Sequence, residues 1–189
     1  YNHMVEYPKV FPSTSLPSIQ DYADAFVLEA SKGNDIICLC LTSKFSGSYN
    51  SACNAANIVR EKYRGVRITV VDTTLATALQ GLLVMEAARM RDSRVPYDIA
   101  LDKIEKMKAS GRIFFSVGSM DYLIHGGRVG KVRGLAASTL GIKPMICLKN
   151  GEIYPDGITR SRKKAFSRIC DQAARYFKEH QENADEYAL

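Results

Sequence analysis

Hydroxyl side chains cluster in a turn that directly follows an apolar run of the sequence. The run is Asp35–Leu41, and the turn that follows it carries Ser46, Gly47 and Ser48. We expect the run to be a buried strand and the turn to lead into a helix. The free N–H groups at the start of a helix and the positive end of its dipole favour an anion. The turn therefore predicts a site for a small anion, with Ser46 as a hydrogen-bond donor.

A second hydroxyl cluster lies earlier in the chain, at Thr14, Ser15 and Ser18 around Pro17. Two hydroxyl loops that converge on one anion would make a more selective site than either loop alone. Ligands of open α/β sheets bind beyond the carboxyl ends of the strands, and Ser46 is expected at such an end.

Two other interpretations of Ser46 stay open, a plain helix cap and a nucleophile. The Gly-x-Ser-x-Gly elbow of serine hydrolases is absent, and no Ser-His-Asp order is evident with His3, His125 or His180. Phosphate-binding loops of the Gly-x-x-x-x-Gly-Lys-Ser/Thr and Gly-x-Gly-x-x-Gly types are absent too. An enzyme that uses the same strand-end pocket, as a hydrolase or a small-molecule phosphotransferase, remains the alternative.

Three further segments carry polar groups of interest. Asp72–Thr74 follows the second predicted strand and could cap the next helix or border the site at the same sheet edge. Gly126–Arg128 is either a helix C-cap or a turn that presents a guanidinium to an anion or partner. Arg160 and Arg162 open the last predicted helix, where cations oppose the helix dipole, so a phosphate or an acidic partner would explain them.

The composition is that of a globular protein, with 189 residues, of which 46% are hydrophobic and 24% charged. No apolar run approaches the roughly 20 residues that span a bilayer. Tyr1–Tyr7 lacks the basic-then-apolar pattern of a signal peptide. We therefore expect a cytoplasmic protein without an integral membrane segment.

The five cysteines are odd in number and lack metal-binding spacing, so we expect reduced, buried thiols, no metal site and no cofactor. The net charge of +6 is concentrated in the last third of the chain, which suggests an anionic ligand or partner. Nucleic-acid binding is a further alternative, but the sequence lacks the exposed aromatics and recognition-helix pattern that would support it.

Alternating helices and strands predict an α/β fold with a mainly parallel, Rossmann-like sheet in the first lobe, residues 1–115. The second lobe, residues 116–189, is predicted to be α+β with antiparallel strands, because Asn150-Gly151 is a strong hairpin signal. The predicted helices are 19–31, 48–63, 76–91, 96–109, 120–124, 135–140 and 161–180, and the predicted strands 35–41, 66–71, 112–117, 142–148 and 152–160. The last helix is predicted to turn Ala165, Ile169, Ala173 and Phe177 inward.

Five collinear motifs between Phe11 and Ala165 together resemble the DegV family. They are Thr14-Ser15-x-Pro17-Ser18, Ser46-Gly47-Ser48-Tyr49-Asn50-Ser51-Ala52, Leu123-x-x-Gly126-Gly127-Arg128-Val129, Ile142-Lys143-Pro144-Met145-Ile146 and Gly151-x-Ile153. These bacterial proteins bind fatty acids, have the EDD fold and resemble the acyl-carrying subunit of fatty acid kinase.

The resemblance implies a non-enzymatic carrier of a long-chain fatty acid, which lies in a tunnel between the two lobes. By the same resemblance, Thr14 and Ser46 hold the carboxylate, with Ser15, Gly47 and Ser48 beside them. A kinase subunit would phosphorylate that carboxylate to an acyl phosphate.

Arg128 and Arg160 are implied to lie toward the kinase. Family members also begin with an earlier strand ending in Asp-Ser and end with a His-x-Gly-x-Gly segment. Neither is visible in this sequence. We therefore expect the first family strand and the C-terminal part of the second lobe to be missing.

Overall fold

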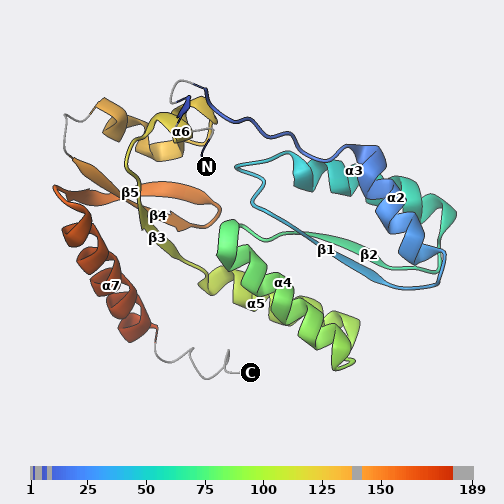
Figure 1. The fold of residues 1–189 in the computed structure, drawn as a ribbon. Helices are drawn as coiled ribbons and strands as arrows, with labels where there is room; N and C mark the ends of the chain where they lie inside the picture. Colours follow the sequence, from blue (N-terminus) through green and yellow to red (C-terminus); the bar gives the residue numbers. More distant parts are fainter. Residues whose placement is uncertain (1, 3–5, 8–9, 138–141, 181–189) are drawn as a thin grey trace. The chain divides into compact units, whose positions relative to one another are not determined.

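The computed structural model describes residues 2, 6–7, 10–137 and 142–180. The chain divides into two compact units. The parallel-sheet unit comprises residues 15–112 and 149–152, and the antiparallel-sheet unit comprises the described parts of 1–14, 113–148 and 153–189. The division into lobes 1–115 and 116–189 stays a prediction. Each unit is described separately below, with the element labels of Figure 1.

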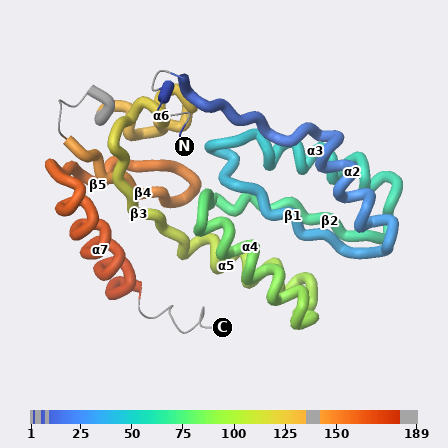
Figure 2. The backbone as a smooth tube through the Cα atoms, in the orientation of Figure 1, coloured from blue at the N-terminus to red at the C-terminus, as the bar shows by residue number. Residues whose placement is uncertain are grey.

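The parallel-sheet unit holds two strands and four helices, in the order α2 (Ile19–Ala30), β1 (Ile36–Cys40), α3 (Ser48–Lys62), β2 (Ile68–Asp72), α4 (Thr77–Asp92) and α5 (Tyr97–Ser110). The strands pair in parallel, from Ile36 opposite Ile68 to Cys40 opposite Asp72. Figures 1 and 2 show β1 and β2 side by side, and both figures draw α2 and α3 close to one another. The predicted alternation of helices and parallel strands is confirmed.

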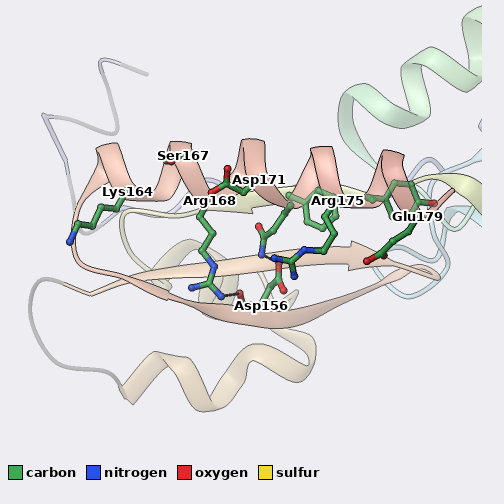
Figure 3. A pocket seen from close by; sticks show the side chains of 10 residues that line it. Asp156, Lys164, Ser167, Arg168, Asp171, Arg175 and Glu179 are labelled. Carbon is green, nitrogen blue, oxygen red and sulfur yellow. Dashed lines mark hydrogen bonds between the residues drawn. The ribbon is translucent and has the colours of Figure 1, made fainter. Parts of the chain in front are cut away.

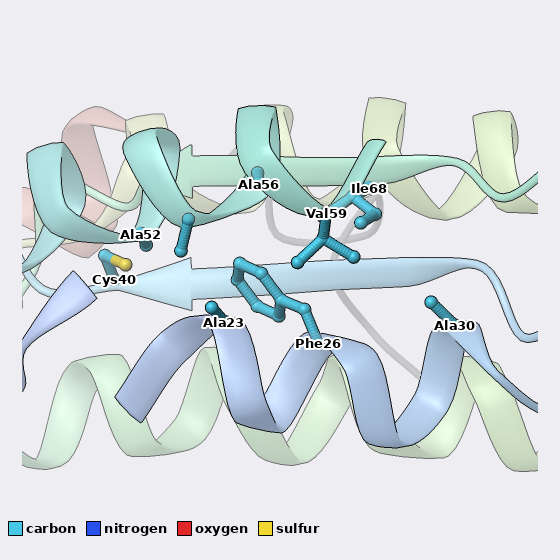
Figure 4. Packing of buried hydrophobic residues seen from close by; sticks show 9 residues of the cluster. Ala23, Phe26, Ala30, Cys40, Ala52, Ala56, Val59 and Ile68 are labelled. Carbon is cyan, nitrogen blue, oxygen red and sulfur yellow. The ribbon is translucent and has the colours of Figure 1, made fainter. Parts of the chain in front are cut away.

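Two hydrophobic clusters cover the two faces of this sheet, because alternate strand residues point to opposite faces. The first joins α2 and α3 to Cys40 and Ile68, and Figure 4 shows Phe26 among these residues. The second joins α4 and α5 to Val71. Residues Ile36–Leu39 of β1 are nevertheless only half-buried, although complete coverage was predicted for this strand. Within the described residues, β1 has β2 as its pairing strand and leaves its other edge uncovered by a strand.

The first two helices of this unit, α2 and α3, begin at the residues that the sequence predicts. Ser18 caps α2, because its hydroxyl accepts the Asp21 N–H (3.1 Å) and the Asp21 carboxylate accepts the Ser18 N–H (2.8 Å). Ala52, Ala55 and Ala56 are fully buried and form the inner stripe of α3. Their small side chains let α3 approach the sheet closely.

The antiparallel-sheet unit contains β3 (Ile113–Ser116), α6 (Asp121–His125), a 3-10 helix (Gly130–Ala137), β4 (Lys143–Lys149), β5 (Glu152–Thr159) and α7 (Arg162–Glu179). Its strand order is β3-β4-β5, and β3 runs antiparallel to β4. The predicted antiparallel strands are confirmed. The helix predicted at 135–140 is replaced by the 3-10 helix, and residues 138–140 lie outside the described residues.

The inward face of α7 differs from the prediction at its C-terminal end. Ala165 is buried, but Phe177 is 72% exposed, so its predicted inward position is wrong. Steps of four residues drift by about 40° each around a helix, which carries Phe177 away from the stripe. Tyr176 takes the inward position instead, and its ring lies 6.4 Å from that of Phe114, centroid to centroid.

The cysteines are free thiols in the described structure. Cys40 and Cys147 are buried as predicted, whereas Cys38 and Cys53 are only half-buried. Cys170 is exposed, so its predicted burial is wrong. It lies on α7 five residues beyond Ala165, about 140° around the helix from the buried face.

Candidate functional site

Ser46 lies in the turn between β1 and α3, where the sequence analysis places an anion site. Its half-buried Oγ accepts a hydrogen bond from the Ser48 backbone N–H (3.1 Å) and lies 2.8 Å from Ser48 Oγ. Gly47 is the N-cap residue of α3, so Ser46 precedes the cap position. Its oxygen still satisfies one of the N–H groups at the start of the helix. Ser46 therefore has a local structural role and keeps part of its surface open.

The first turn of α3 leaves further donors at this place. The first bond between backbone groups of the helix start runs from the Ser51 N–H to the Gly47 carbonyl (3.0 Å). The N–H groups of Tyr49 and Asn50 precede that bond, and such groups have no partner within their own helix. Their position beside Ser46 is that of the donors that bind anions at helix N-termini.

Asp72 lies at the end of β2, beside the turn after β1. Its carboxylate accepts the backbone N–H groups of Thr74 (2.9 Å) and Ser43 (3.3 Å to each oxygen). The helix that follows, α4, has Ala76 at its N-cap, so the interpretation of Asp72–Thr74 as the cap of that helix is wrong. The contact with Ser43 shows that both strands end at the same edge of the sheet.

Two threonine hydroxyls at this edge are engaged inside the protein. Thr42 is buried and donates to the Gly151 carbonyl (3.0 Å), and Thr73 is buried and donates to the Cys40 carbonyl (2.7 Å). A Cβ atom on Gly151 would lie 2.5 Å from Thr42 Oγ1, so only glycine fits there. Sequence reasoning treated Gly151 as a turn residue and missed its contact with Thr42.

The second hydroxyl loop reaches this turn through Leu16. A Cβ atom on Gly47 would lie 3.1 Å from Leu16 Cδ2, so glycine lets the two loops approach closely. Ser15, beside Leu16, is exposed. Thr14 is also exposed and belongs to the antiparallel-sheet unit. The joint use of Thr14 and Ser46 by one ligand stays a prediction.

Arg128 and Arg160 are both exposed residues of the antiparallel-sheet unit. Gly126 is the C-cap of α6 and Gly127 has φ +70°, so the glycine pair ends this helix. The Arg128 guanidinium donates to the Gly126 carbonyl. Arg160 precedes Ser161, the N-cap of α7. Their contact with a phosphate or a partner stays a prediction.

Two hollows in the antiparallel-sheet unit were not predicted. A groove of about 530 Å³ follows α7, and Figure 3 shows Arg168 and Asp156 on its walls. Cationic and anionic side chains are balanced there, namely Lys164, Arg168 and Arg175 against Asp156, Asp171 and Glu179. A second hollow of about 410 Å³ is lined by Phe166 and Ile169 and by the cationic side chains of Lys143 and Arg162.

Metal-binding clusters and membrane-spanning helices are absent from the described ranges. These residues hold no group of three His, Cys, Asp or Glu side chains placed to bind a metal ion. None of their helices combines the length and the apolar character that a membrane crossing requires.

Together, the fold and the turn define an α/β protein with hydroxyl and backbone donors at the carboxyl edge of a parallel sheet. The model of the DegV family matches residues 1–188. A DegV domain-containing protein of Clostridium perfringens is 34% identical over 173 residues, which cover 91% of this chain and 59% of that protein. The chain belongs to the DegV family.

Two further relatives carry names that mention a ligand. A protein of Thermotoga maritima named fatty acid-binding protein is 32% identical over 164 residues, 85% of this chain and 55% of its own length. The crystal structure of a stearic acid-binding protein of Eubacterium ventriosum is 43% identical with a TM-score of 0.89, covering 97% of this chain and 62% of that one. The chain thus spans somewhat more than half the length of these relatives.

Proposed function

We propose that this chain binds a long-chain fatty acid, with the carboxylate at the turn between β1 and α3. The observation that carries the proposal is the half-buried Ser46 hydroxyl, which lies at a strand end beside the first N–H groups of α3. The relative from Eubacterium ventriosum, which is described as binding stearic acid, supports the choice of ligand.

The energetics of such a ligand divide between tail and head group. Each buried methylene contributes about 0.8 kcal/mol, so a long acyl chain gains on the order of 10 kcal/mol before opposing costs. A buried carboxylate without partners would cost several kcal/mol. Charge-assisted hydrogen bonds from Ser46 and the α3 N–H groups would offset that cost. The tail therefore supplies most of the affinity, and the hydroxyls orient the ligand.

The neighbouring residues have distinct parts in the proposal. Ser48 supports Ser46 from the first turn of α3, and Gly47 lets the loop of Leu16 approach. Ser15 borders Leu16 in sequence. Thr14 lies two residues before Leu16, so chain connectivity keeps their Cα atoms within about 7 Å. This connectivity is compatible with a second hydroxyl donor from Thr14. The tunnel for the tail stays a prediction from the family resemblance.

We further propose that the bound fatty acid is presented to a kinase subunit, with Arg128 and Arg160 facing that partner. Both arginines are exposed, as such a contact requires. The carrier interpretation is favoured over a serine hydrolase by the partners of Ser46. Among the described residues, its side chain bonds to Ser48, whereas a nucleophilic serine needs an adjacent general base.

Native mass spectrometry of the purified protein tests the proposed ligand, together with a titration with oleate. We expect a co-purified fatty acid, and weaker oleate binding when Ser46→Ala is combined with Thr14→Ala. Ser43→Ala is the matched control, because it removes an exposed hydroxyl of the same turn and keeps the backbone contact with Asp72. The proposal fails if the protein neither carries a fatty acid after purification nor binds oleate in the titration.

A further inference from the structure

Thr42 holds the base of the turn between β1 and α3. It lies two residues after the end of β1 and is 1% exposed. Its backbone N–H donates to the Leu75 carbonyl (2.8 Å), and its carbonyl accepts the Phe45 N–H (3.0 Å), which closes a four-residue turn. Its hydroxyl accepts the Lys44 N–H (3.3 Å) and donates to the Gly151 carbonyl (3.0 Å). Each polar group of Thr42 therefore has a partner within the parallel-sheet unit.

Gly151 brings the tip of the β4–β5 hairpin to this turn. Residues 149–152 are grouped with the parallel-sheet unit by their contacts. Asn150 and Gly151 both have positive φ, +52° and +81°, as a type I′ hairpin turn requires. A Cβ atom on Gly151 would lie 2.5 Å from Thr42 Oγ1 and 3.6 Å from Lys44 Cγ. The tip therefore packs directly against the turn, and its carbonyl is the acceptor that fixes the Thr42 hydroxyl.

The turn sets the direction in which the chain enters the candidate site. Ser46 directly follows Phe45, the last residue of the turn that Thr42 closes. On the other side, Ser46 Oγ is held by the Ser48 N–H at the start of α3 (3.1 Å). The Ser46 hydroxyl therefore has one support from the helix and one from the strand end. A binding group must be held to within about 0.5 Å of its productive position, so both supports matter.

We infer that Thr42 is a positioning residue of the proposed carboxylate site: the Gly151 carbonyl fixes its hydroxyl, and the turn that it closes directs Ser46 Oγ toward the ligand. This inference rests on the proposed function. Thr42 is buried and its hydroxyl proton is donated to Gly151, so it acts through the turn and does not touch the ligand. Removing the hydroxyl frees the turn from the hairpin tip and deprives the buried Gly151 carbonyl of that donor.

Oleate and oleyl alcohol separate a positioning role from a structural one, because they share a tail and differ in the head group. Hydrogen bonds to an ionised carboxylate are roughly twice as strong as neutral ones, so oleate depends more on the direction of its donors. Thr42→Val keeps the size of the side chain and removes its hydroxyl. We expect it to weaken oleate binding about tenfold, the range of a hydrogen bond to a charged group, and oleyl alcohol binding by less than about threefold. Thr42→Ser keeps the hydroxyl and should bind oleate within about twofold of the wild type, although it deletes a buried methyl group.

Thr73→Val is the matched control for the loss of a buried hydroxyl. Thr73 is fully buried at the same sheet edge, but its hydroxyl donates to the Cys40 carbonyl (2.7 Å) and not to the hairpin tip. The control should destabilise the fold much as Thr42→Val does and leave the ratio of the two affinities unchanged. An unchanged ratio in Thr42→Val, no recovery in Thr42→Ser, or an equal change in the control would overturn the inference.

Hydrogen exchange of the wild-type chain provides the test if Thr42→Val does not fold. Oleate should slow the exchange of the Phe45 amide, which closes the turn at Thr42, more than that of the Val66 amide. The Val66 N–H closes a comparable turn between α3 and β2 by donating to the Tyr63 carbonyl (3.1 Å). Equal slowing at the two amides would show that the turn has no special part in binding. A wild-type chain that binds no oleate would instead remove the proposed function itself, and this inference with it.

Discussion

Replacing Gly151 by alanine should destabilise the parallel-sheet unit more than its turn conformation alone requires. Gly151 has φ +81°, a conformation that costs an L-residue about 1–2 kcal/mol. The new Cβ would also lie 2.5 Å from Thr42 Oγ1 and displace the hydroxyl that donates to the Gly151 carbonyl. Disrupting this buried hydrogen bond adds about 1–3 kcal/mol. We therefore expect the free energy of unfolding to fall by about 2–5 kcal/mol.

Urea denaturation followed by far-UV circular dichroism measures this loss, and Gly33→Ala provides the control. Gly33 has φ +79°, nearly that of Gly151, but its added Cβ would meet no atom within 4 Å. Gly33→Ala should therefore cost only the conformational part, about 1–2 kcal/mol. If Gly151→Ala costs no more than Gly33→Ala, the contact with Thr42 has no energetic importance and the reasoning is refuted.

Three further predictions concern packing, pH dependence and thiol reactivity. Ile104→Ala on α5 removes a fully buried side chain and should lower the free energy of unfolding by about 2–5 kcal/mol. Ile99, on the same helix, is 50% exposed, so Ile99→Ala should lower it by well under half of that. Equal losses in urea denaturation would contradict the assigned burial. Hydrogen bonds from Arg67 lower the pKa of Asp35. The stabilisation that these bonds give is therefore present above the ordinary carboxyl pKa and is lost as the pH falls through the lower pKa of the folded state. Arg67→Gln should raise the Asp35 pKa in an NMR titration, and an unchanged pKa would refute this. Cys170 should react with maleimide before the other four cysteines, as peptide mass mapping can show, and faster labelling of a buried thiol would speak against the described α7 surface.

The parts of the fold that the sequence predicts are those fixed by local patterns. Ser18 and Asp21 specify the start of α2 by a capping box, and Ala52, Ala55 and Ala56 of α3 follow the helical period. Phe177 shows the limit of such patterns. Steps of four residues look periodic in a sequence, yet the true repeat of 3.6 places Tyr176 on the inner face instead.

The candidate site depends partly on contacts that no local pattern records. Ser46 follows an apolar strand, and its position at the strand end is predictable from that order. The bond from Thr42 to Gly151 joins residues 109 positions apart, so nothing in either segment alone announces it. The approach of Leu16 to Gly47 likewise depends on how two separate loops pack in the folded unit.

The most direct test of the proposed function follows the ligand's own carboxyl group. NMR of oleate labelled with ¹³C at that carbon reports both its binding and its protonation. Donors from Ser46 and the start of α3 should hold the bound carboxylate ionised and lower its pKa below that of free oleate. Ser46→Ala should move the pKa back upward. The absence of a bound signal, or a bound carboxyl whose pKa ignores Ser46→Ala, would contradict the proposed site.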